Sequence, residues 1–411
     1  MPSSSALPGS SALITTPEEI LALAQKLALA KEIAFDTEFI RESTFYPKLE
    51  ILQIATRTEA WLVDVQAFAT GRSGRIDSFD TDKLKPLIDV LLNPAILKVV
   101  RAAHGDQECL LSAFGMLATP VFDTAIGASL CGMGDNIGLG NLMKSVLGVE
   151  HPKGYARTNW SKRPLPKPVL EYALLDVQHL IETAEVLFER LDKAGRRTWA
   201  MELSSKFCDR ALYEVPPDEV ARRLAQSGKF NVRDYGVLFE LVKWREERVR
   251  ELNVPRRWLA DDGVLIDLAK IKPTTSEQLH GFRGLSKGEV KEPHASRILN
   301  AVKRGSAPGV EIPSDLKRRA VLQASSEESR IIDLLRVCLS VLADEYEIAS
   351  KHIVPPASLL PLVRLRPKTI EDLVSSELVS SQLGDAGMKK LFDFITGKQV
   401  LTIDGGRVRL K

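Results

Sequence analysis

Two carboxylates, Asp36 and Glu38, stand in the stretch AFDTEFIREST (residues 34–44), which otherwise reads as an apolar β-strand. Side chains alternate between the two faces of a strand, so these acids share one face, about 6 to 7 Å apart. Carboxylates at that distance repel each other unless a metal ion or buried Arg and Lys side chains neutralise them. The stretch is therefore either an edge strand with a solvated polar face or part of a site that holds such a partner.

Two later segments carry acids that could reach the same site. Asp106 follows the apolar run LKVVRAA (97–103) at the start of a helix-like segment, where a carboxylate can also be a simple helix cap. In PVLEYALLDVQHLIETAEVLFERL, Tyr172 and Asp176 are four residues apart and share a helical face, although they could form an ordinary surface pair. If the segments meet, the carboxylates suit a pair of Mg²⁺ or Mn²⁺ ions, which can stabilise the attacking and leaving oxygens of a phosphodiester.

The elements that must position these residues follow an α/β pattern. A capping box at Thr16 and Glu19, with proline between them, predicts a helix through Leu27. Strand-like runs joined by short turns then predict an antiparallel meander, followed by a helix and a further strand. The strand-like runs are 33–39, 49–56, 60–65 and 97–103, and the helix is KLKPLIDVLLN. We expect one α/β domain with a mixed sheet flanked by helices.

Helical periodicity replaces the strand signals beyond about residue 205. Two later segments share an order of proline-bearing turns and short apolar helices, which indicates a diverged tandem repeat. The expected organisation is a flexible tail (1–14), the α/β domain (15–205), a connection (206–227), a first helical domain (228–305), a linker (306–324), a second helical domain (325–400), and a C-terminal tail or hairpin (401–411).

The composition sets broad limits on function. Lys and Arg number 56 and Asp and Glu 54, so attraction to nucleic acid must come from local patches. The four cysteines have no metal-ligand spacing, which predicts free thiols, no disulfides and no zinc site. Neither a targeting segment nor an apolar run long enough for a membrane span is present, which favours the cytoplasm.

The acidic segments together resemble the motifs of DEDD-type 3′-to-5′ exonucleases, specifically ribonuclease D. The three matching segments are FDTEFIRESTFYPKLEILQIA, AAHGDQECLL and TNWSKRPLPKPVLEYALLDVQHL. Tyrosine four residues before Asp176 is typical of the tyrosine subclass. The helical segments resemble HRDC domains, the second more weakly than the first. The resemblance implies a ribonuclease H-like nuclease domain followed by two small helical domains.

That resemblance also implies roles for the residues. Asp36, Glu38, Asp106 and Asp176 would hold two divalent cations, Mg²⁺ or Mn²⁺, and Tyr172 would orient the attacking water. The expected substrate is RNA with a free 3′ end, such as a tRNA precursor, degraded to nucleoside 5′-monophosphates by a monomeric enzyme. A DNA exonuclease of the same chemistry and a non-catalytic RNA-binding protein on this fold are the alternatives.

The sequence departs from the family pattern at Arg101, because the family usually has histidine five residues before the second-motif aspartate. His104 is interpreted as a bystander. The change affects packing or support around the site rather than the carboxylate itself.

A loop ahead of the third motif interleaves basic residues with an aromatic, which suits phosphate contacts and base stacking, although a solvated basic loop has the same composition. Its candidate substrate-binding residues are Lys153, Arg157, Trp160, Lys162 and Arg163. In the first helical domain the densest basic cluster is Arg256, Arg257 and Trp258. Phe45 and Tyr46, beside a proline, are more typical of packing or a turn.

Overall fold

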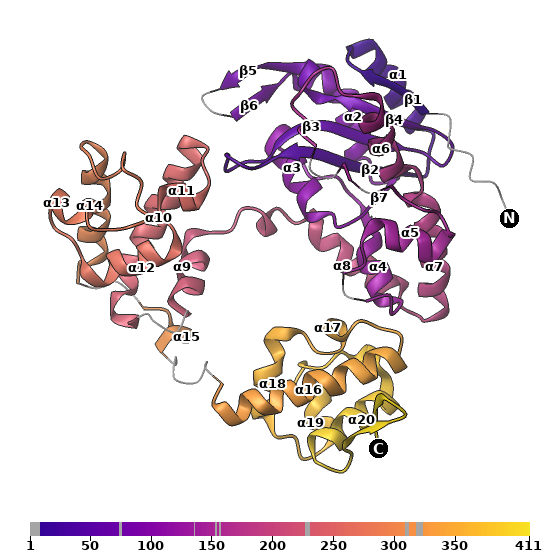
Figure 1. Cartoon of the computed structure of the whole chain (residues 1–411), viewed down its shortest axis with the longest axis vertical. Helices are drawn as coiled ribbons and strands as arrows, with labels where there is room; N and C mark the ends of the chain where they lie inside the picture. Colours follow the sequence, from indigo (N-terminus) through magenta and orange to yellow (C-terminus); the bar gives the residue numbers. More distant parts are fainter. Residues whose placement is uncertain are drawn as a thin grey trace.

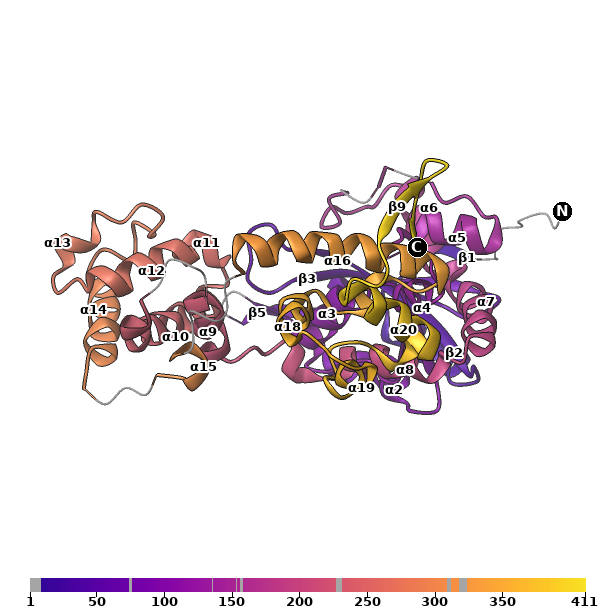
Figure 2. The same ribbon diagram turned by 90° about the horizontal axis from the view of Figure 1, so that it is seen from below.

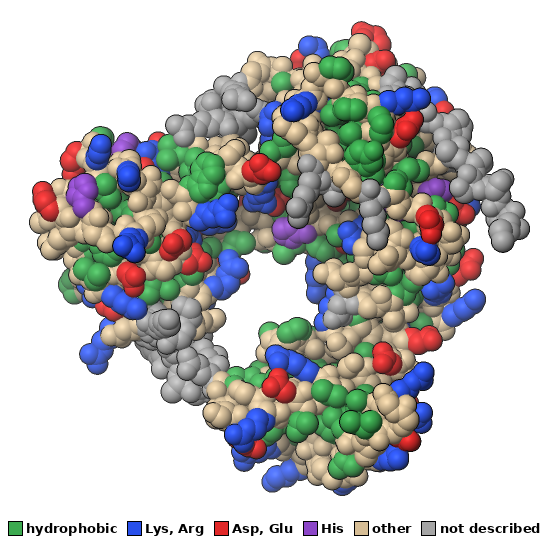
Figure 3. Space-filling view, viewed as in Figure 1, with side chains coloured by type: hydrophobic (Ala, Val, Ile, Leu, Met, Phe, Trp, Pro, Cys, Tyr) green, Lys and Arg blue, Asp and Glu red, His purple; other side chains and the backbone are tan. Residues whose placement is uncertain are grey.

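The structure is a computed structural model. It describes residues 9–73, 76–134, 136–152, 154–155, 158–226, 231–308, 312–317 and 324–411. Three domains surround a central opening (Figures 1 and 3). The first contains a β-sheet between layers of helices, and the other two are helical.

The first domain is built on a mixed six-stranded sheet in the order β1-β4-β3-β2-β7-β8. Neighbouring strands are antiparallel in β4-β3-β2, the predicted meander, and parallel in the other pairs. The strands are β1 (Gly9–Ile14), β2 (Glu32–Ile40), β3 (Lys48–Ala55), β4 (Ala60–Asp64), β7 (Leu97–Val100) and β8 (Val121–Asp123), and a separate hairpin is formed by β5 (Ala69–Ser73) and β6 (Ile76–Phe79).

The alternation along β2 places its side chains in two cores. Ile33 and Phe35 pack in the core on one face of the sheet, and Ala34 packs in the core on the other. Because β2 lies between β3 and β7, it is an interior strand, which excludes the edge-strand interpretation of Asp36 and Glu38.

Helices cover both faces of this sheet. They are α1 (Pro17–Leu27), α2 (Thr81–Leu92), α3 (His104–Phe114), α4 (Thr124–Leu130), α5 (Leu139–Leu147), α6 (Lys167–Gln178), α7 (Leu180–Lys193) and α8 (Arg197–Ser205). The predicted capping box is present, with Thr16 accepting from the backbone of Glu19 and the Glu19 carboxylate accepting from the backbone of Thr16. The strand predicted at 97–103 ends earlier, at Val100, because Ala102 has a φ of 58° and cannot continue a strand.

The prediction that residues 1–14 form a flexible tail is wrong for residues 9–14. They form β1, which pairs in parallel with β4 and closes that edge of the sheet. The segment GSSALI has no strand-like alternation, so the hydrogen bonds offered by β4 decide its conformation. Residues 1–8 lie outside the described residues.

The first helical domain contains α9 (Pro217–Gln226), α10 (Tyr235–Leu252), α11 (Arg256–Leu259), α12 (Asp262–Ile271), α13 (Ser276–Leu279), α14 (His294–Gly305) and α15 (Ser314–Lys317). Its boundaries are wider than predicted. Val220 and Ala221 of α9, expected in the connection, and Leu316 of α15, expected in the linker, are buried in its core. Because α9 is strongly amphipathic, its apolar face must be buried, and it packs against α10.

The second helical domain repeats the order of the first. It contains α16 (Ser326–Glu345), α17 (Ser350–Ile353), α18 (Leu359–Leu365), α19 (Ile370–Ser375) and α20 (Gly384–Ile395), and the predicted hairpin follows as β9 (Leu401–Asp404) and β10 (Arg407–Leu410). Left-handed residues follow corresponding helices: Asn253 and Glu347 follow the long helices α10 and α16, and Lys272 and Arg366 follow α12 and α18. The repeat predicted from the proline-bearing turns is therefore visible in the backbone.

The second helical domain packs directly on the first, α/β domain (Figure 2). Buried residues from both form one continuous core, and Arg196 donates to the carbonyl oxygens of Leu130, Tyr346 and Glu347 across the junction. All four cysteines are free, as predicted. None of the described helices is long and apolar enough to cross a membrane.

Candidate active site

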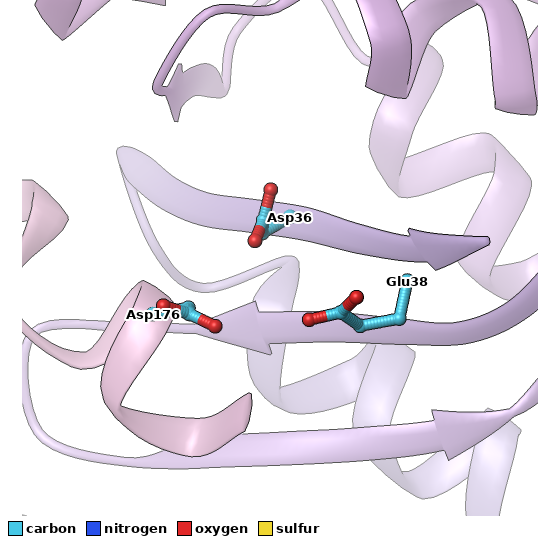
Figure 4. A group of neighbouring side chains, drawn as sticks. All are labelled: Asp36, Glu38 and Asp176. Carbon is cyan, nitrogen blue, oxygen red and sulfur yellow. The ribbon is translucent and has the colours of Figure 1, made fainter. Parts of the chain in front are cut away.

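The Asp36 and Glu38 side chains project from one face of β2 toward helix α6. Their carboxylates and that of Asp176 point into a common space (Figure 4). One carboxylate oxygen from each of the three lies within 4.8 Å of the others, the spacing of a group that can share a metal ion. Asp36 and Glu38 therefore share one face of β2, as the alternation of strand side chains predicted.

Helix α6 delivers both third-motif residues to this space. Its buried residues Leu170, Ala173 and Val177 hold it against the sheet. Tyr172 and Asp176, one turn apart, then lie together beside β2. Asp176 is only 5% exposed, which excludes the alternative of a surface pair with Tyr172.

Asp106 enters from the first turn of α3, as the sequence predicted. It is not the helix cap, because α3 begins after Ala103 without a side-chain cap. Asp106 Oδ1 instead accepts hydrogen bonds from the backbone N–H of Thr37, at 3.1 Å, and from the Thr37 hydroxyl, at 2.6 Å. Because Thr37 stands between Asp36 and Glu38, these bonds fix the second motif to the first.

The electrostatics of the four acids are unfavourable without a counter-charge. Burial, reinforced by Asp106, Asp176 and Glu38, raises the pKa of Asp36 well above its usual value. Burial, followed by the charges of Asp176 and Asp106, raises the pKa of Glu38 to about 8. Burial also raises the pKa of Asp106 to about 7, although the Thr37 hydrogen bonds oppose that change, and it raises the pKa of Asp176.

Tyr172 lies among these groups as a neutral phenol. Burial, followed by the charges of Asp176 and Glu38, moves its pKa further above the ordinary value. The hydroxyl therefore keeps its proton at neutral pH and can donate or accept a hydrogen bond. A phenol in this state can orient a water molecule but is a poor general base.

The sequence did not reveal His151, which joins the site from the segment after α5. Its Nε2 lies 3.0 Å from Asp176 Oδ1, and its ring meets that of Tyr172 edge-on at 5.3 Å. Tyr155 packs on the same tyrosine, with ring centroids 5.5 Å apart. Burial lowers the pKa of His151, but the Asp176 carboxylate outweighs that effect and raises it. His151 belongs to no recognisable sequence motif, so a single sequence does not predict its place in the site.

Arg101, the departure from the family pattern, lies beside the site without entering the group of carboxylates. Its Nη2 donates to the carbonyl oxygen of Ile137 at 2.8 Å, and its charge partly opposes the rise in the pKa of Asp176. His104 is exposed and its ring lies tilted against that of Tyr213, with centroids 5.1 Å apart. Arg101 therefore supports the site electrostatically.

The structure changes the interpretation of the predicted substrate loop. Trp160 is 2% exposed and packs in the core, so the prediction that it stacks on a base is wrong for this conformation. Arg163 holds Asp64 through paired bonds of 2.6 and 2.7 Å, which occupy its guanidinium and contradict its use as a phosphate ligand. Lys162 is exposed and its role stays a prediction, while Lys153 and Arg157 lie outside the described residues.

The aromatic and basic residues near the first helical domain are interdomain contacts. Phe45 packs on the core of that domain, and the guanidinium groups of Arg250 and Arg256 lie 5.1 and 4.9 Å from its ring centroid. Arg256 also forms two bonds of 2.7 Å with the buried Glu246. The prediction that Phe45 packs instead of contacting substrate is confirmed. The Arg256 guanidinium is mostly occupied by its bonds to Glu246 and its contact with the Phe45 ring.

A divalent cation fits the donor set at the centre of the domain. Carboxylate oxygens are the ligands that Mg²⁺ and Mn²⁺ prefer, and a cation would relieve the repulsion that raises the pKa values of the acids. Asp36, Glu38 and Asp176 are placed to bind it together, with Asp106 hydrogen-bonded alongside. The arrangement suits metal-dependent phosphodiester hydrolysis.

Comparisons with known proteins agree with this geometry. Residues 12–192 match the family model described as 3′-5′ exonuclease, and residues 234–302 match that of the HRDC domain. Ribonuclease D of Nitrobacter hamburgensis is 35% identical over 318 residues, covering 77% of this chain and 79% of that protein. Ribonuclease D of Gluconacetobacter diazotrophicus is 32% identical over 375 residues, covering 91% and 90%.

Among solved structures, that of Escherichia coli RNase D, described as an exoribonuclease involved in structured RNA processing, aligns with a TM-score of 0.73 at 22% identity. The alignment covers 93% of this chain and 98% of that one, which shows a shared fold through all three domains. Sequence identity and domain order lead to the same assignment: this chain belongs to the ribonuclease D family of 3′-to-5′ exonucleases.

Proposed function

We propose that this protein removes nucleotides one at a time from the 3′ end of RNA, using divalent cations held by Asp36, Glu38, Asp106 and Asp176. The observation that carries the proposal is the convergence of these acids from β2, α3 and α6 on one partly buried site. An RNA with a free 3′ end is the substrate, and tRNA precursors are the class that the family resemblance suggests.

The chain's own residues would act by positioning. Bound cations, two of Mg²⁺ or Mn²⁺, supply Lewis-acid stabilisation of the attacking and departing oxygens. The Tyr172 hydroxyl would orient the attacking water, since its raised pKa keeps it protonated. Water oxygen then bonds to phosphorus as the bond from phosphorus to the 3′ oxygen breaks, which releases a nucleoside 5′-monophosphate and leaves a new 3′ hydroxyl.

The surroundings of the site support hydrolysis without a helper subunit. His151 and Tyr155 hold the Tyr172 ring, and His151 also faces Asp176, so the aromatic and acidic partners are fixed within one domain. We infer a monomeric enzyme on this basis. The free cysteines fit a reducing compartment, and we propose the cytoplasm.

One assay tests the function. RNA labelled at its 3′-terminal nucleotide is incubated with Mg²⁺, with EDTA, and with the Asp36→Asn variant in Mg²⁺. Labelled monophosphate should appear only with the unaltered protein and Mg²⁺. Equal release under all conditions would refute the metal mechanism.

Three further substrates define direction and sugar preference. A circular RNA should remain intact, because it offers no 3′ end, and an RNA blocked by a 3′-phosphate should be degraded more slowly. A DNA strand of matched sequence should be degraded more slowly than RNA. Faster digestion of DNA would support the alternative of a DNA exonuclease, and rapid cutting of the circle would contradict an exonuclease.

A further inference from the structure

A cleft of about 1300 Å³ separates the nuclease domain from the first helical domain. One wall is formed by residues next to the first two acidic motifs and the other by α9, α10 and α11. Pockets for small molecules usually enclose about 300 to 1,000 Å³. This cleft is larger and open along the domain boundary, as expected of a site for a segment of polymer.

The cleft begins beside the proposed catalytic acids. Arg41, which lines it, follows directly after β2, the strand of Asp36 and Glu38. His104, which also lines it, opens α3 two residues before Asp106. A strand whose 3′ end lies among the acids can therefore continue into the cleft.

The lining is basic, but most of its positive charge is already paired. Six arginines and four carboxylates line the cleft. Arg41 pairs with Glu108, Arg210 with Glu214, Arg245 with Asp262 and Arg256 with the buried Glu246.

Arg223 on α9 differs from these arginines. It is exposed and lines the cleft, and its side chain forms no ion pair or hydrogen bond with any residue in the described parts of the chain. Its guanidinium can therefore bind a phosphate without first breaking an existing pair.

The cleft also offers aromatic surface near the acids. The exposed His104 ring lies against Tyr213, which is only half-buried, with centroids 5.1 Å apart. Tyr213 is fixed by its hydroxyl, which donates to the Phe207 carbonyl oxygen at 2.9 Å. Aromatic faces beside a basic groove are the usual combination for binding single-stranded nucleic acid without reading sequence.

We propose that this cleft binds the single-stranded RNA segment on the 5′ side of the scissile bond, with Arg223 contacting a backbone phosphate and the His104–Tyr213 pair offering a stacking face. The inference rests on the proposed exoribonuclease function and assigns to it a second contact region, which begins beside the acids and extends along α9. Short substrates should not reach Arg223, and long substrates should.

The test compares two neighbouring arginines of α9. Arg223→Glu places a negative charge in the cleft, and Arg223→Lys retains the positive one. Arg222→Glu is the matched control, since Arg222 is also exposed, pairs with Asp218 at 3.5 Å, and does not line the cleft. Each protein is assayed on a dinucleotide and on a 5′-fluorescein-labelled oligoadenylate of about 12 nucleotides, within the 4 to 16 typical of single-strand sites.

For the longer RNA, Arg223→Glu should raise KM about tenfold without lowering kcat, and the dependence of log affinity on log salt should become shallower by about 0.7. The dinucleotide should be cleaved as by the unaltered protein. Arg223→Lys should restore most of the affinity, and Arg222→Glu should match the unaltered protein on both substrates. Equal behaviour of Arg223→Glu and Arg222→Glu on the longer RNA would overturn the proposal.

A measurement of RNA binding tests this inference independently of the catalytic proposal. Fluorescence anisotropy of the labelled oligoadenylate is measured in the Asp36→Asn background, with and without Arg223→Glu, and should show the same tenfold loss. If the unaltered protein cleaves neither RNA, the proposed function fails while anisotropy still decides the cleft. If cleavage proceeds but neither KM nor anisotropy responds to Arg223→Glu, only the cleft proposal fails.

Discussion

The Nε2 atom of His151 lies 3.0 Å from Oδ1 of Asp176, and Nδ1 of the same ring lies 3.0 Å from the carbonyl oxygen of Pro152. A carbonyl oxygen only accepts, so Nδ1 carries a proton, and the imidazole is held with its other nitrogen toward the acid. His151 thus links the segment after α5 to the third motif, and its ring also supports Tyr172.

Replacing His151 with glutamine should lower kcat/KM by about 10- to 100-fold, the usual cost of losing a partner that orients a metal ligand. Affinity for Mn²⁺ should fall in parallel, which steady-state kinetics and a metal titration would measure. His179→Gln is the control, because His179 ends α6 and faces Glu182 instead of the site. A His151→Gln enzyme with normal kinetics and metal affinity would show that the contact is dispensable.

Tyr172→Phe removes the hydroxyl while keeping the ring packed between His151 and Tyr155. If the hydroxyl positions the attacking water, kcat should drop by about 100-fold with little change in KM. Tyr155→Phe, on the adjoining ring, should retain nearly full kcat. A large rise in KM without loss of kcat would instead assign Tyr172 to substrate binding.

Acidity should stabilise the metal-free protein. The folded-state pKa of Glu38 is about 8 and that of Asp106 about 7, above their ordinary values of 4.5 and 3.8. The folded state therefore binds more protons than the unfolded state, and the free energy of unfolding falls as pH rises from about 4 to 8. The raised pKa of His151 acts in the same direction, since its favourable charge is lost as pH rises.

Thermal unfolding in EDTA should accordingly show Tm decreasing between pH 5 and pH 8, a window taken from those pKa values. Mg²⁺ should restore Tm mainly at the upper end, where the acids are ionised. Asp36→Asn should flatten the metal-free profile because it removes one of the repelling charges. A Tm in EDTA that rises across this window would contradict the assigned pKa directions.

The side chain of Asn253 fixes the first helical domain to the loop after β2. Its Oδ1 accepts from the backbone N–H groups of Phe45 and Tyr46, both at 3.0 Å. Asn253→Gly should release this contact while tolerating the left-handed backbone, with φ of 48°. Each lost bond costs about 1 kcal/mol, so amide hydrogen exchange in residues 41–47 should quicken.

Lys272→Gly provides the control for Asn253→Gly, because Lys272 has a similar left-handed backbone, with φ of 52°, and pairs with Asp234 within its own domain. It should leave exchange in residues 41–47 unchanged. Equal exchange in both variants would show that the Asn253 bonds do not hold the loop.

The parts of the site that follow from local periodicity were predictable from sequence. Alternation along β2 put Asp36 and Glu38 on one face, and one helical turn put Tyr172 beside Asp176. The position of Asp106 at the start of α3 was also predictable, but its bonds to Thr37 depend on the approach of two distant segments.

The structural features that the local sequence pattern does not determine were missed or misassigned. β1 exists because β4 offers it an edge, and nothing in GSSALI requires a strand. Trp160 and Arg163 have the residue types of a nucleic-acid loop, but the fold places one in the core and the other against Asp64. His151 reaches Asp176 through an irregular segment, for which no periodicity predicts a direction.

The central claim is that four acids from distant segments jointly bind divalent cations. Mn²⁺ binding to the purified protein, followed by isothermal titration calorimetry, tests it most directly, with Asp36→Asn and Asp176→Asn as the altered proteins and Asp192→Asn, an exposed acid paired with Arg197, as the control. The unaltered and control proteins should bind Mn²⁺ alike, with a stoichiometry of about two ions per chain, and both site variants should lose at least one of those ions. Unchanged binding by Asp36→Asn and Asp176→Asn would contradict the claim.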